Sequence, residues 1–194
     1  MLGRLIKKLI KKQIKILLIK RNRVNLFLFL KMCGIIISKN VNRRYIMIAI
    51  GADHGGYKLK EEIKKYLDEK EIPYKDFGTY SEDRVDYPNI AKEVAKAVQS
   101  NKCDKGILIC RSGYGMAMVA NKFKGIRSAP CFVEEAAKFS RMHNNTNVLA
   151  LGADYVTVNQ AICILRIWLA TEFEGGRHQD RLDIVEEIEN ENMK

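Results

Sequence analysis

From Ile46 onward, apolar runs alternate with amphipathic segments, and this alternation constrains the fold more than any other feature of the chain. The apolar runs predict five strands, at residues 46–51, 72–78, 106–110, 126–132 and 147–152. The segments between and after them carry apolar residues at helical spacing. They predict helices at residues 57–70, 89–100, 115–123, 133–143, 158–173 and 177–192. Strands separated by helices predict an α/β fold, in which helices cover both faces of a parallel sheet.

Charge divides the chain near residue 45. Residues 1–45 contain 13 of the 34 Lys and Arg residues and no Asp or Glu, whereas residues 46–194 contain 21 basic and 23 acidic residues, a net charge of −2. We therefore predict a basic extension over residues 1–45 and a globular domain over residues 46–194. The near-neutral domain does not favour binding to nucleic acid, because it has no excess of basic residues to contact phosphates.

The extension contains a basic amphipathic segment at residues 5–20, in which leucines and isoleucines recur at helical spacing and lysines fill the other face. Lys31 interrupts the apolar run that follows, so no uncharged stretch reaches the roughly 18 residues of a membrane span. Contact with a membrane surface is expected only if the extension is part of the natural protein. We favour the alternative of a start codon assigned too early, with Met47 as the first residue, because a self-contained fold begins there.

The cysteines and histidines do not form a metal-binding pattern. Five cysteines occur without a C-x-x-C pair and the three histidines are scattered, which argues against a disulfide framework and against a zinc site of the Cys/His type. We predict no metal and no cofactor. Free thiols favour a reducing compartment and hence the cytoplasm. Cys103, Cys131 and Cys163 are interpreted as small buried apolar side chains.

Two polar, glycine-rich stretches follow the first and third predicted strands: GADHGG at residues 51–56 and CRSGYG at residues 110–115. Ligands of such sheets bind beyond the carboxyl ends of the strands, so neighbouring first and third strands would bring these stretches together. Gly113 and Gly115 allow a sharp turn that exposes main-chain N–H groups to an anion. The pattern is neither a P-loop nor a dinucleotide fingerprint, and a tight turn without a ligand is the alternative.

Cys110 stands where the third strand meets this loop. A following helix N-terminus favours the thiolate, which predicts a proton-transferring group rather than an inert thiol. Asp53 and His54 lie beyond the first strand, where capping of the next helix is the alternative role. His143 follows a helix, where a capping role is equally compatible with its position.

Arg177 and Arg181 are four residues apart and therefore share one face of the last helix. Together with His178 they would clamp a phosphate, and surface pairing with acidic residues is the alternative. A thiolate base, a histidine, an anion-binding loop and two guanidinium groups together suit proton transfer on a small phosphorylated substrate.

Five motifs in order resemble the type B ribose-5-phosphate isomerase family, which includes galactose-6-phosphate and allose-6-phosphate isomerases. They occupy residues 48–67, 76–88, 106–129, 143–154 and 173–182. The resemblance implies a Rossmann-like three-layer α/β/α fold with a five-stranded parallel sheet. It also implies a homodimer or homotetramer with active sites shared between subunits. The implied reaction interconverts D-ribose 5-phosphate and D-ribulose 5-phosphate through an enediolate, a step of the pentose phosphate pathway that needs no metal.

The resemblance also implies residue roles. Cys110 would move the proton between C1 and C2, and His143 would donate a proton during opening of the furanose ring. The residues that would hold the sugar are Asp53, His54 and Asn144. The main-chain N–H groups that would steady the enediolate oxygens come from Arg111, Ser112, Gly113, Tyr114 and Gly115. Arg177 and Arg181 would hold the phosphate from the partner subunit.

Three positions, in two parts of the chain, depart from the family pattern. Many relatives have Gly and Thr where Arg111 and Ser112 stand, and Arg, which helps bind the phosphate end, where Asp154 stands. Arg111 supplies a cation that would compensate for the acidic residue. Three alternatives stay open: isomerisation of allose 6-phosphate or galactose 6-phosphate, a non-catalytic sugar-phosphate binding protein, and a membrane-surface protein defined by its extension. Cys110 and His143 together argue against the non-catalytic alternative.

Overall fold

The computed structural model describes residues 46–193, and the predicted basic extension lies outside this part of the chain. Five strands are present: β1 (Ile48–Ala52), β2 (Tyr74–Asp76), β3 (Lys105–Cys110), β4 (Ser128–Pro130) and β5 (Val148–Gly152). All pair in parallel, in the order β2-β1-β3-β5-β4. The predicted five-stranded parallel sheet and the adjacency of its first and third strands are confirmed.

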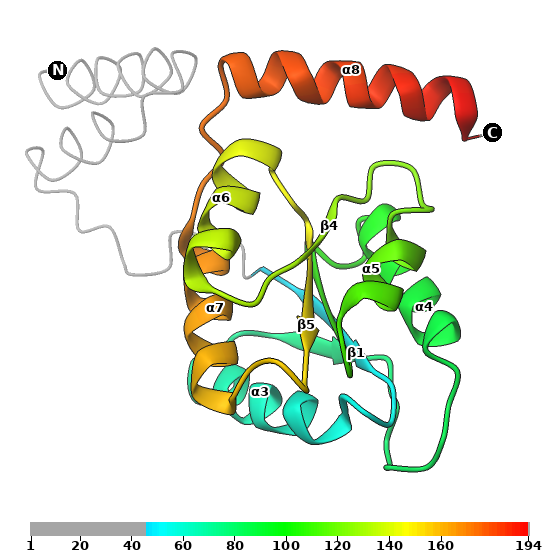
Figure 1. The fold of residues 1–194 in the computed structure, drawn as a ribbon, viewed down its shortest axis with the longest axis vertical. Coiled ribbons are helices and arrows are strands. Elements are labelled where there is room, and N and C mark those ends of the chain that lie inside the picture. Colours follow the sequence, from blue (N-terminus) through cyan, green and yellow to red (C-terminus); the bar gives the residue numbers. More distant parts are fainter. Residues whose placement is uncertain (1–45, 194) are drawn as a thin grey trace, which may run out of the picture. The chain divides into compact units, whose positions relative to one another are not determined.

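Helices cover both faces of this sheet. They are α3 (Tyr57–Glu69), α4 (Tyr87–Gln99), α5 (Tyr114–Ala120), α6 (Glu134–Asn144) and α7 (Val158–Ala170). The last helix, α8 (Arg177–Asn192), lies beside α6 and does not cover the sheet. Figure 1 shows α3, α6 and α7 on one side of the strands and α4 and α5 on the other. Within residues 46–193, the structure contains no helix with the length and apolar character needed to cross a membrane.

The side chains of each strand alternate between the two faces of the sheet, and each face has its own hydrophobic cluster. In β3, Ile107 and Ile109 pack with the α3, α6 and α7 side, whereas Leu108 and Cys110 pack with the α4 and α5 side. Successive side chains of a strand point to opposite faces, so this division follows directly from the sequence. Cys110 therefore faces the side from which α5 leaves the sheet.

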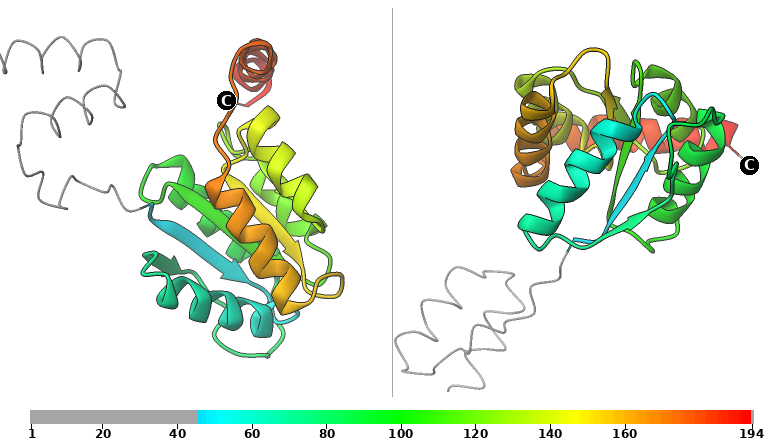
Figure 2. Two further views of the ribbon diagram at one scale, coloured as in Figure 1. Left: turned by 90° about the vertical axis from the view of Figure 1, so that its left-hand side faces the viewer. Right: turned by 90° about the horizontal axis from the view of Figure 1, so that it is seen from below.

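The sheet has a carboxyl edge and an amino edge, where its strands end and begin, and the length of the strands separates them. The carboxyl ends of β1 and β5 lie at the bottom of Figure 1, whereas α8 lies at the top, near the end of α6. The same vertical separation is visible after a quarter turn in Figure 2. β5 has five residues, which separates the two edges by about 17 Å.

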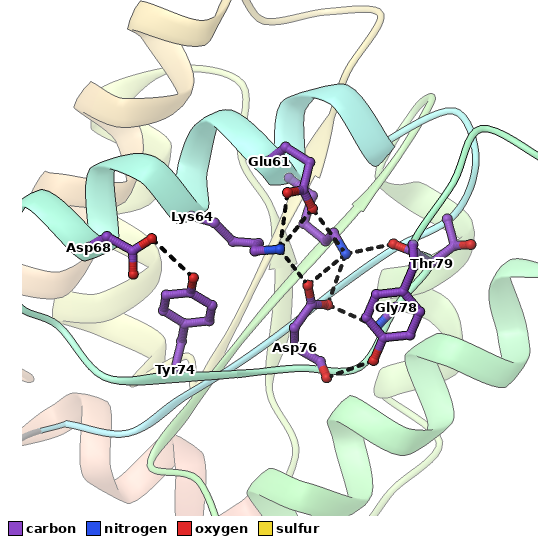
Figure 3. Close-up of polar contacts among 9 residues, drawn as sticks. Glu61, Lys64, Asp68, Tyr74, Asp76, Gly78 and Thr79 are labelled. Carbon is purple, nitrogen blue, oxygen red and sulfur yellow. Dashed lines mark hydrogen bonds and ion pairs between the residues drawn. The ribbon is translucent and has the colours of Figure 1, made fainter.

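A buried lysine holds the turn after β2. Lys60 of α3 is fully buried, and its Nζ donates to both carboxylate oxygens of Asp76, at 2.8 and 2.9 Å, and to the carbonyl of Thr79 at 2.6 Å. Asp76 also accepts a hydrogen bond from the N–H of Gly78 at 2.9 Å and pairs with Lys64 at 2.9 Å (Figure 3). The carboxylate of Asp76 and the carbonyl of Thr79 thus compensate the buried positive charge of Lys60.

The turn after β2 also fixes the end of β1. The N–H of Ala52 donates to the carbonyl of Gly78 at 2.7 Å, and the N–H of Thr79 donates to the carbonyl of Ala52 at 2.6 Å. Asp53 follows immediately, so the lysine-centred network positions the first residue beyond the strand.

Candidate active site

Cys110 ends β3 at the carboxyl edge of the sheet and is only 5% exposed. Its Sγ accepts a hydrogen bond from the N–H of Gly113 at 3.1 Å. Gly113 has a φ of +78° at the position that precedes α5, a conformation that a residue with a Cβ adopts only at an energetic cost. The turn therefore directs a main-chain N–H donor at the sulfur.

Asp53 and His54 occupy the neighbouring loop after β1. Asp53 is buried, its Oδ1 accepts from the N–H of Gly56 at 2.9 Å, and its own N–H donates to the carbonyl of Ile109 at 3.1 Å. Nδ1 of His54 accepts from the N–H of Val85 at 3.4 Å. Because Nδ1 is an acceptor, the neutral ring carries its proton on Nε2, which is left free to donate.

Arg111 lies at the mouth of this site. Its Nε is 3.6 Å from Oδ2 of Asp154, and its carbonyl accepts from the N–H of the same aspartate at 3.0 Å. Its side chain also lies against Gly55, where a Cβ would come within 2.4 Å of the arginine Cγ. Arg111 and Asp154, two of the residues expected to depart from the family pattern, therefore contact each other beside Cys110.

The other loop residues lie at the same edge. The carbonyl of Ser112 lies against Gly152, where a Cβ would come within 2.8 Å of it. Tyr114 is half exposed and packs edge-on against Phe132, with ring centroids 5.5 Å apart, and its ring lies 6.5 Å from that of Tyr155. These aromatic rings form one wall beside the glycine loop.

Tyr87, at the start of α4, is a neighbour that the sequence did not identify. A Cβ on Gly115 would come within 2.8 Å of its ring, so the tyrosine lies against the start of α5. Nothing in the spacing around Tyr87 distinguishes it from other surface tyrosines, because its position depends on how the loop after β2 returns to the sheet.

The other predicted site residues lie at the opposite edge. His143 and Asn144 end α6, whereas Arg177 and Arg181 are exposed on α8. The ring of His143 stacks on that of His178, with centroids 4.2 Å apart and an interplanar angle of 6°. Within one subunit these residues do not meet Cys110, because the length of the sheet lies between them.

An unpredicted acidic residue joins this second cluster. Oε2 of Glu174 is 3.9 Å from Nε2 of His143 and 3.7 Å from Nε2 of His178. Desolvation, then the charges of His143 and Arg177, lower the pKa of His178 below its ordinary value. The one available sequence signal was the four-residue spacing between Glu174 and His178, which is too common to stand out alone.

A groove of about 550 Å³ separates α8 from the β4 side of the domain. Its lining includes Asn144 and the apolar side chains Ile126, Pro130, Leu182, Val185, Ile188 and Met193. Two further observations mark α8 as incompletely covered: Ile184 is 56% exposed and Ile188 is 53% exposed. Apolar side chains exposed in a row on one helix are typical of a surface that binds another protein.

Comparison with known proteins agrees with the motifs. A family model described as "Ribose/Galactose Isomerase" matches residues 48–185. The chain belongs to this family. Among curated relatives of the isomerase, ribose-5-phosphate isomerase B of Escherichia coli is 46% identical over 142 residues, which cover 73% of this chain and 95% of that protein. The chain is accordingly a sugar-phosphate isomerase.

Solved structures give the same result. A ribose-5-phosphate isomerase B from Clostridium thermocellum is 46% identical and aligns with a TM-score of 0.74, over 75% of this isomerase and 98% of that chain. The enzyme from Mycoplasma genitalium with bound ribulose-5-phosphate is 41% identical and aligns with a TM-score of 0.72, over 75% of this isomerase and 97% of that chain. The aligned part of this chain thus corresponds to almost the whole length of these two structures.

Proposed function

We propose that this isomerase interconverts D-ribose 5-phosphate and D-ribulose 5-phosphate, with Cys110 as the base. The observation that carries the proposal is the hydrogen bond from the N–H of Gly113 to the sulfur of Cys110, at the sheet edge where Asp53 and His54 also lie. A base at this place has main-chain N–H donors beside it, which can stabilise the oxyanion that proton abstraction creates.

The chemistry follows from that position. The thiolate of Cys110 removes the proton from C2 of the open-chain aldose, the C–H electron pair forms the C1–C2 double bond, and the carbonyl pair moves to O1. The resulting enediolate is stabilised by main-chain N–H groups of residues 111–115. The Cys110 thiol then returns the proton to C1, the hydroxyl proton of O2 passes to O1, and a C2 carbonyl forms. No net oxidation or reduction occurs.

A second subunit completes the proposed site. His143 is assigned as the proton donor for furanose ring opening, Asn144 as a ligand of the sugar, and Arg177 and Arg181 as phosphate ligands, because guanidinium groups bind phosphate in a bidentate manner. The sheet separates these residues from Cys110 of the same chain. A homodimer, or a homotetramer built from such dimers, would bring the two edges together, and the exposed apolar side chains of α8 supply a contact surface.

The ion pair of Arg111 and Asp154 supports a second candidate substrate class. Because the acidic residue neutralises the arginine, the mouth of the site has no net charge from this pair. Binding of the phosphate therefore depends more on the arginines of α8, and a six-carbon aldose phosphate would present its phosphate farther from the reacting carbons. Allose 6-phosphate and galactose 6-phosphate are the candidates of this class.

The test follows ketose formation by the purified full-length protein from ribose 5-phosphate, allose 6-phosphate and galactose 6-phosphate. We expect the highest kcat/KM with ribose 5-phosphate. A higher value with either six-carbon substrate would replace the proposed substrate and keep the reaction type.

The role of Cys110 is tested in the same assay. Cys110→Ala should still bind the sugar phosphate and lose at least about 100-fold in turnover, the scale typical for removing a proton-transferring group. Cys163→Ala, on α7, is the matched control and should keep wild-type turnover. Near-normal turnover of Cys110→Ala would contradict the assignment.

Residues 46–194 are proposed to form the whole catalytic domain. The four cysteines of the described part are free, as a cytoplasmic enzyme with a reactive thiol requires. The basic extension contributes nothing to this chemistry, because each residue assigned above belongs to the domain.

A further inference from the structure

Three metal-ligating side chains from separate parts of the chain converge at the amino edge of the sheet. Nε2 of His143, at the end of α6, and Nε2 of His178, in the first turn of α8, flank Oε2 of Glu174, and all three atoms lie within 4.8 Å of one another. The side chain of His178 is buried, and the main chain of Glu174 is held by a hydrogen bond from its N–H to the carbonyl of Met142 at 3.0 Å.

The distances suit a small cation. A tetrahedral zinc ion with bonds of about 2.1 Å separates its ligand atoms by about 3.4 Å. The carboxylate oxygen of Glu174 is 3.9 Å from Nε2 of His143 and 3.7 Å from Nε2 of His178, a few tenths of an ångström beyond that separation. The rings of His143 and His178 are stacked and nearly parallel, so their in-plane lone pairs do not converge as they stand. The side chain of Glu174 is 57% exposed and that of His143 is 35% exposed, so the carboxylate can approach and the His143 ring can turn to direct its nitrogen at the same ion.

We infer that His143, Glu174 and His178 form a binding site for a divalent transition-metal cation of the zinc class. Two imidazoles and one carboxylate make up the three-ligand set of open zinc sites, in which solvent or a small ligand takes the fourth position. Magnesium and calcium prefer all-oxygen sites, so the two imidazoles select against them. Arg177 and Arg181 lie nearby and oppose a dication, so the affinity is weaker than that of a structural zinc site.

Metal binding at this site inhibits the isomerase. This consequence rests on the proposed function, in which His143 donates a proton during ring opening. A metal on Nε2 occupies the ring position that would carry the proton, and it places a dication beside the proposed phosphate ligands. The inhibition is reversible, because no covalent bond of the protein is made or broken.

Direct binding is measured with Zn²⁺ on the full-length Cys110→Ala protein, in which the alanine removes the reactive thiol as a competing ligand. Affinity is obtained by competition with a chromogenic zinc indicator. We expect one bound Zn²⁺ per subunit, and at least tenfold weaker binding after Glu174→Gln in the same background. Glu172→Gln removes a neighbouring exposed carboxylate and should leave the affinity unchanged. With Co²⁺ as the probe, the visible absorption of a low-coordinate site should appear and should be lost with Glu174→Gln.

Inhibition is measured separately, with the native cysteine present. Zn²⁺ should abolish turnover and a chelator should restore it. The Zn²⁺ concentration for half-inhibition, taken relative to each protein's own turnover without Zn²⁺, should be at least tenfold higher for Glu174→Gln than for Glu172→Gln. Equal zinc affinity of the Glu174→Gln and Glu172→Gln proteins, or no binding in the Cys110→Ala background, would overturn the site. Binding that depends on Glu174 without inhibition would support the site and contradict the assigned role of His143, so the two failures are distinguishable.

Discussion

Nε of Arg111 lies 3.6 Å from Oδ2 of Asp154, directly beside the cysteine that ends β3. Both side chains are largely solvent-exposed, at 74% and 53%, and exposed pairs contribute only about 0–1 kcal/mol to stability. The pair therefore has little effect on folding. Its effect is electrostatic, because the carboxylate offsets the positive charge that an anionic substrate would meet at the mouth of the site.

Asp154→Asn should increase the affinity for the substrate. The change removes the anion and leaves Arg111 free to contact phosphate or sugar hydroxyls, so KM for ribose 5-phosphate should fall by about two- to fivefold. Turnover and the melting temperature should stay near wild type. Initial rates over a range of substrate concentrations give both constants, and Glu69→Gln, an exposed change of equal charge on α3, should alter neither. A rise in KM would show instead that the aspartate holds the arginine in its binding position.

Asp76→Asn should destabilise the domain by about 3 kcal/mol. It leaves the buried ammonium of Lys60 without its charged partner, and breaking a buried pair from one side typically costs about 3–5 kcal/mol. Lys64→Met removes the more exposed arm of the same network and should cost about 1 kcal/mol or less. Denaturant unfolding measures both, and equal losses in the two variants would contradict the central role of Lys60.

The same network predicts a pH dependence. Burial of Asp76 favours its neutral form, but hydrogen bonds from Lys60, Lys64 and the N–H of Gly78 outweigh it and lower the pKa of this carboxyl. A lowered folded-state pKa gives stability that is complete above the unfolded value of about 3.9 and is lost as the pH falls through the folded value. The difference in unfolding free energy between wild type and Asp76→Asn should therefore shrink below about pH 4.

Lys105 predicts that the free energy of unfolding also depends on pH in the alkaline range. Desolvation, and then the charge of Arg141, lower its pKa to about 8. The folded state thus binds fewer protons than the unfolded state between about pH 8 and 10.5, and stability from this group rises with pH across that interval. Lys105→Met should stabilise the domain by about 2–3 kcal/mol at pH 7, and the gain should vanish above about pH 10.5. A gain that is independent of pH would assign it to packing against Trp168 instead.

Removal of residues 1–46 should leave the enzyme intact. The excess positive charge ends at this boundary, and the first strand begins at Ile48. A chain that begins at Met47 should form the same oligomer and keep kcat/KM within a few-fold, as measured by light scattering and by the ketose assay. A truncated chain that misfolds while the full-length protein is active would make the extension part of the enzyme.

Local pattern was sufficient for most of the fold. Apolar runs predicted the strands, and apolar residues at helical spacing predicted the helices. The loops after β1 and β3 were predicted to meet because parallel strands share their carboxyl edge. Lys60 was not predicted to be buried. Leu59 and Ile63 recur at helical spacing and are buried as apolar residues of such a pattern should be. The burial of a lysine depends instead on a partner in another segment, here Asp76, sixteen residues along the chain.

The sequence predicted the individual residues of the candidate site, but not how all of them lie relative to one another. Cys110 and Asp53 follow strands, so topology alone places them together. The separation of His143 from Cys110 depends on the direction in which α6 returns along the sheet, which the motifs do not express. Glu174 was missed because its relationship to His143 exists only once α8 folds back beside α6.

The proposal that two subunits share each active site is tested most directly with two inactive variants. One chain carries Cys110→Ala and the other His143→Ala, each with a different affinity tag, and mixed dimers are isolated by sequential purification on both tags. In a symmetric dimer each mixed molecule holds one intact and one doubly defective site, so we predict about half of the wild-type turnover per dimer, with each parent variant nearly inactive. Purified mixed dimers no more active than the parent variants would contradict a site that combines Cys110 of one subunit with His143 of the other.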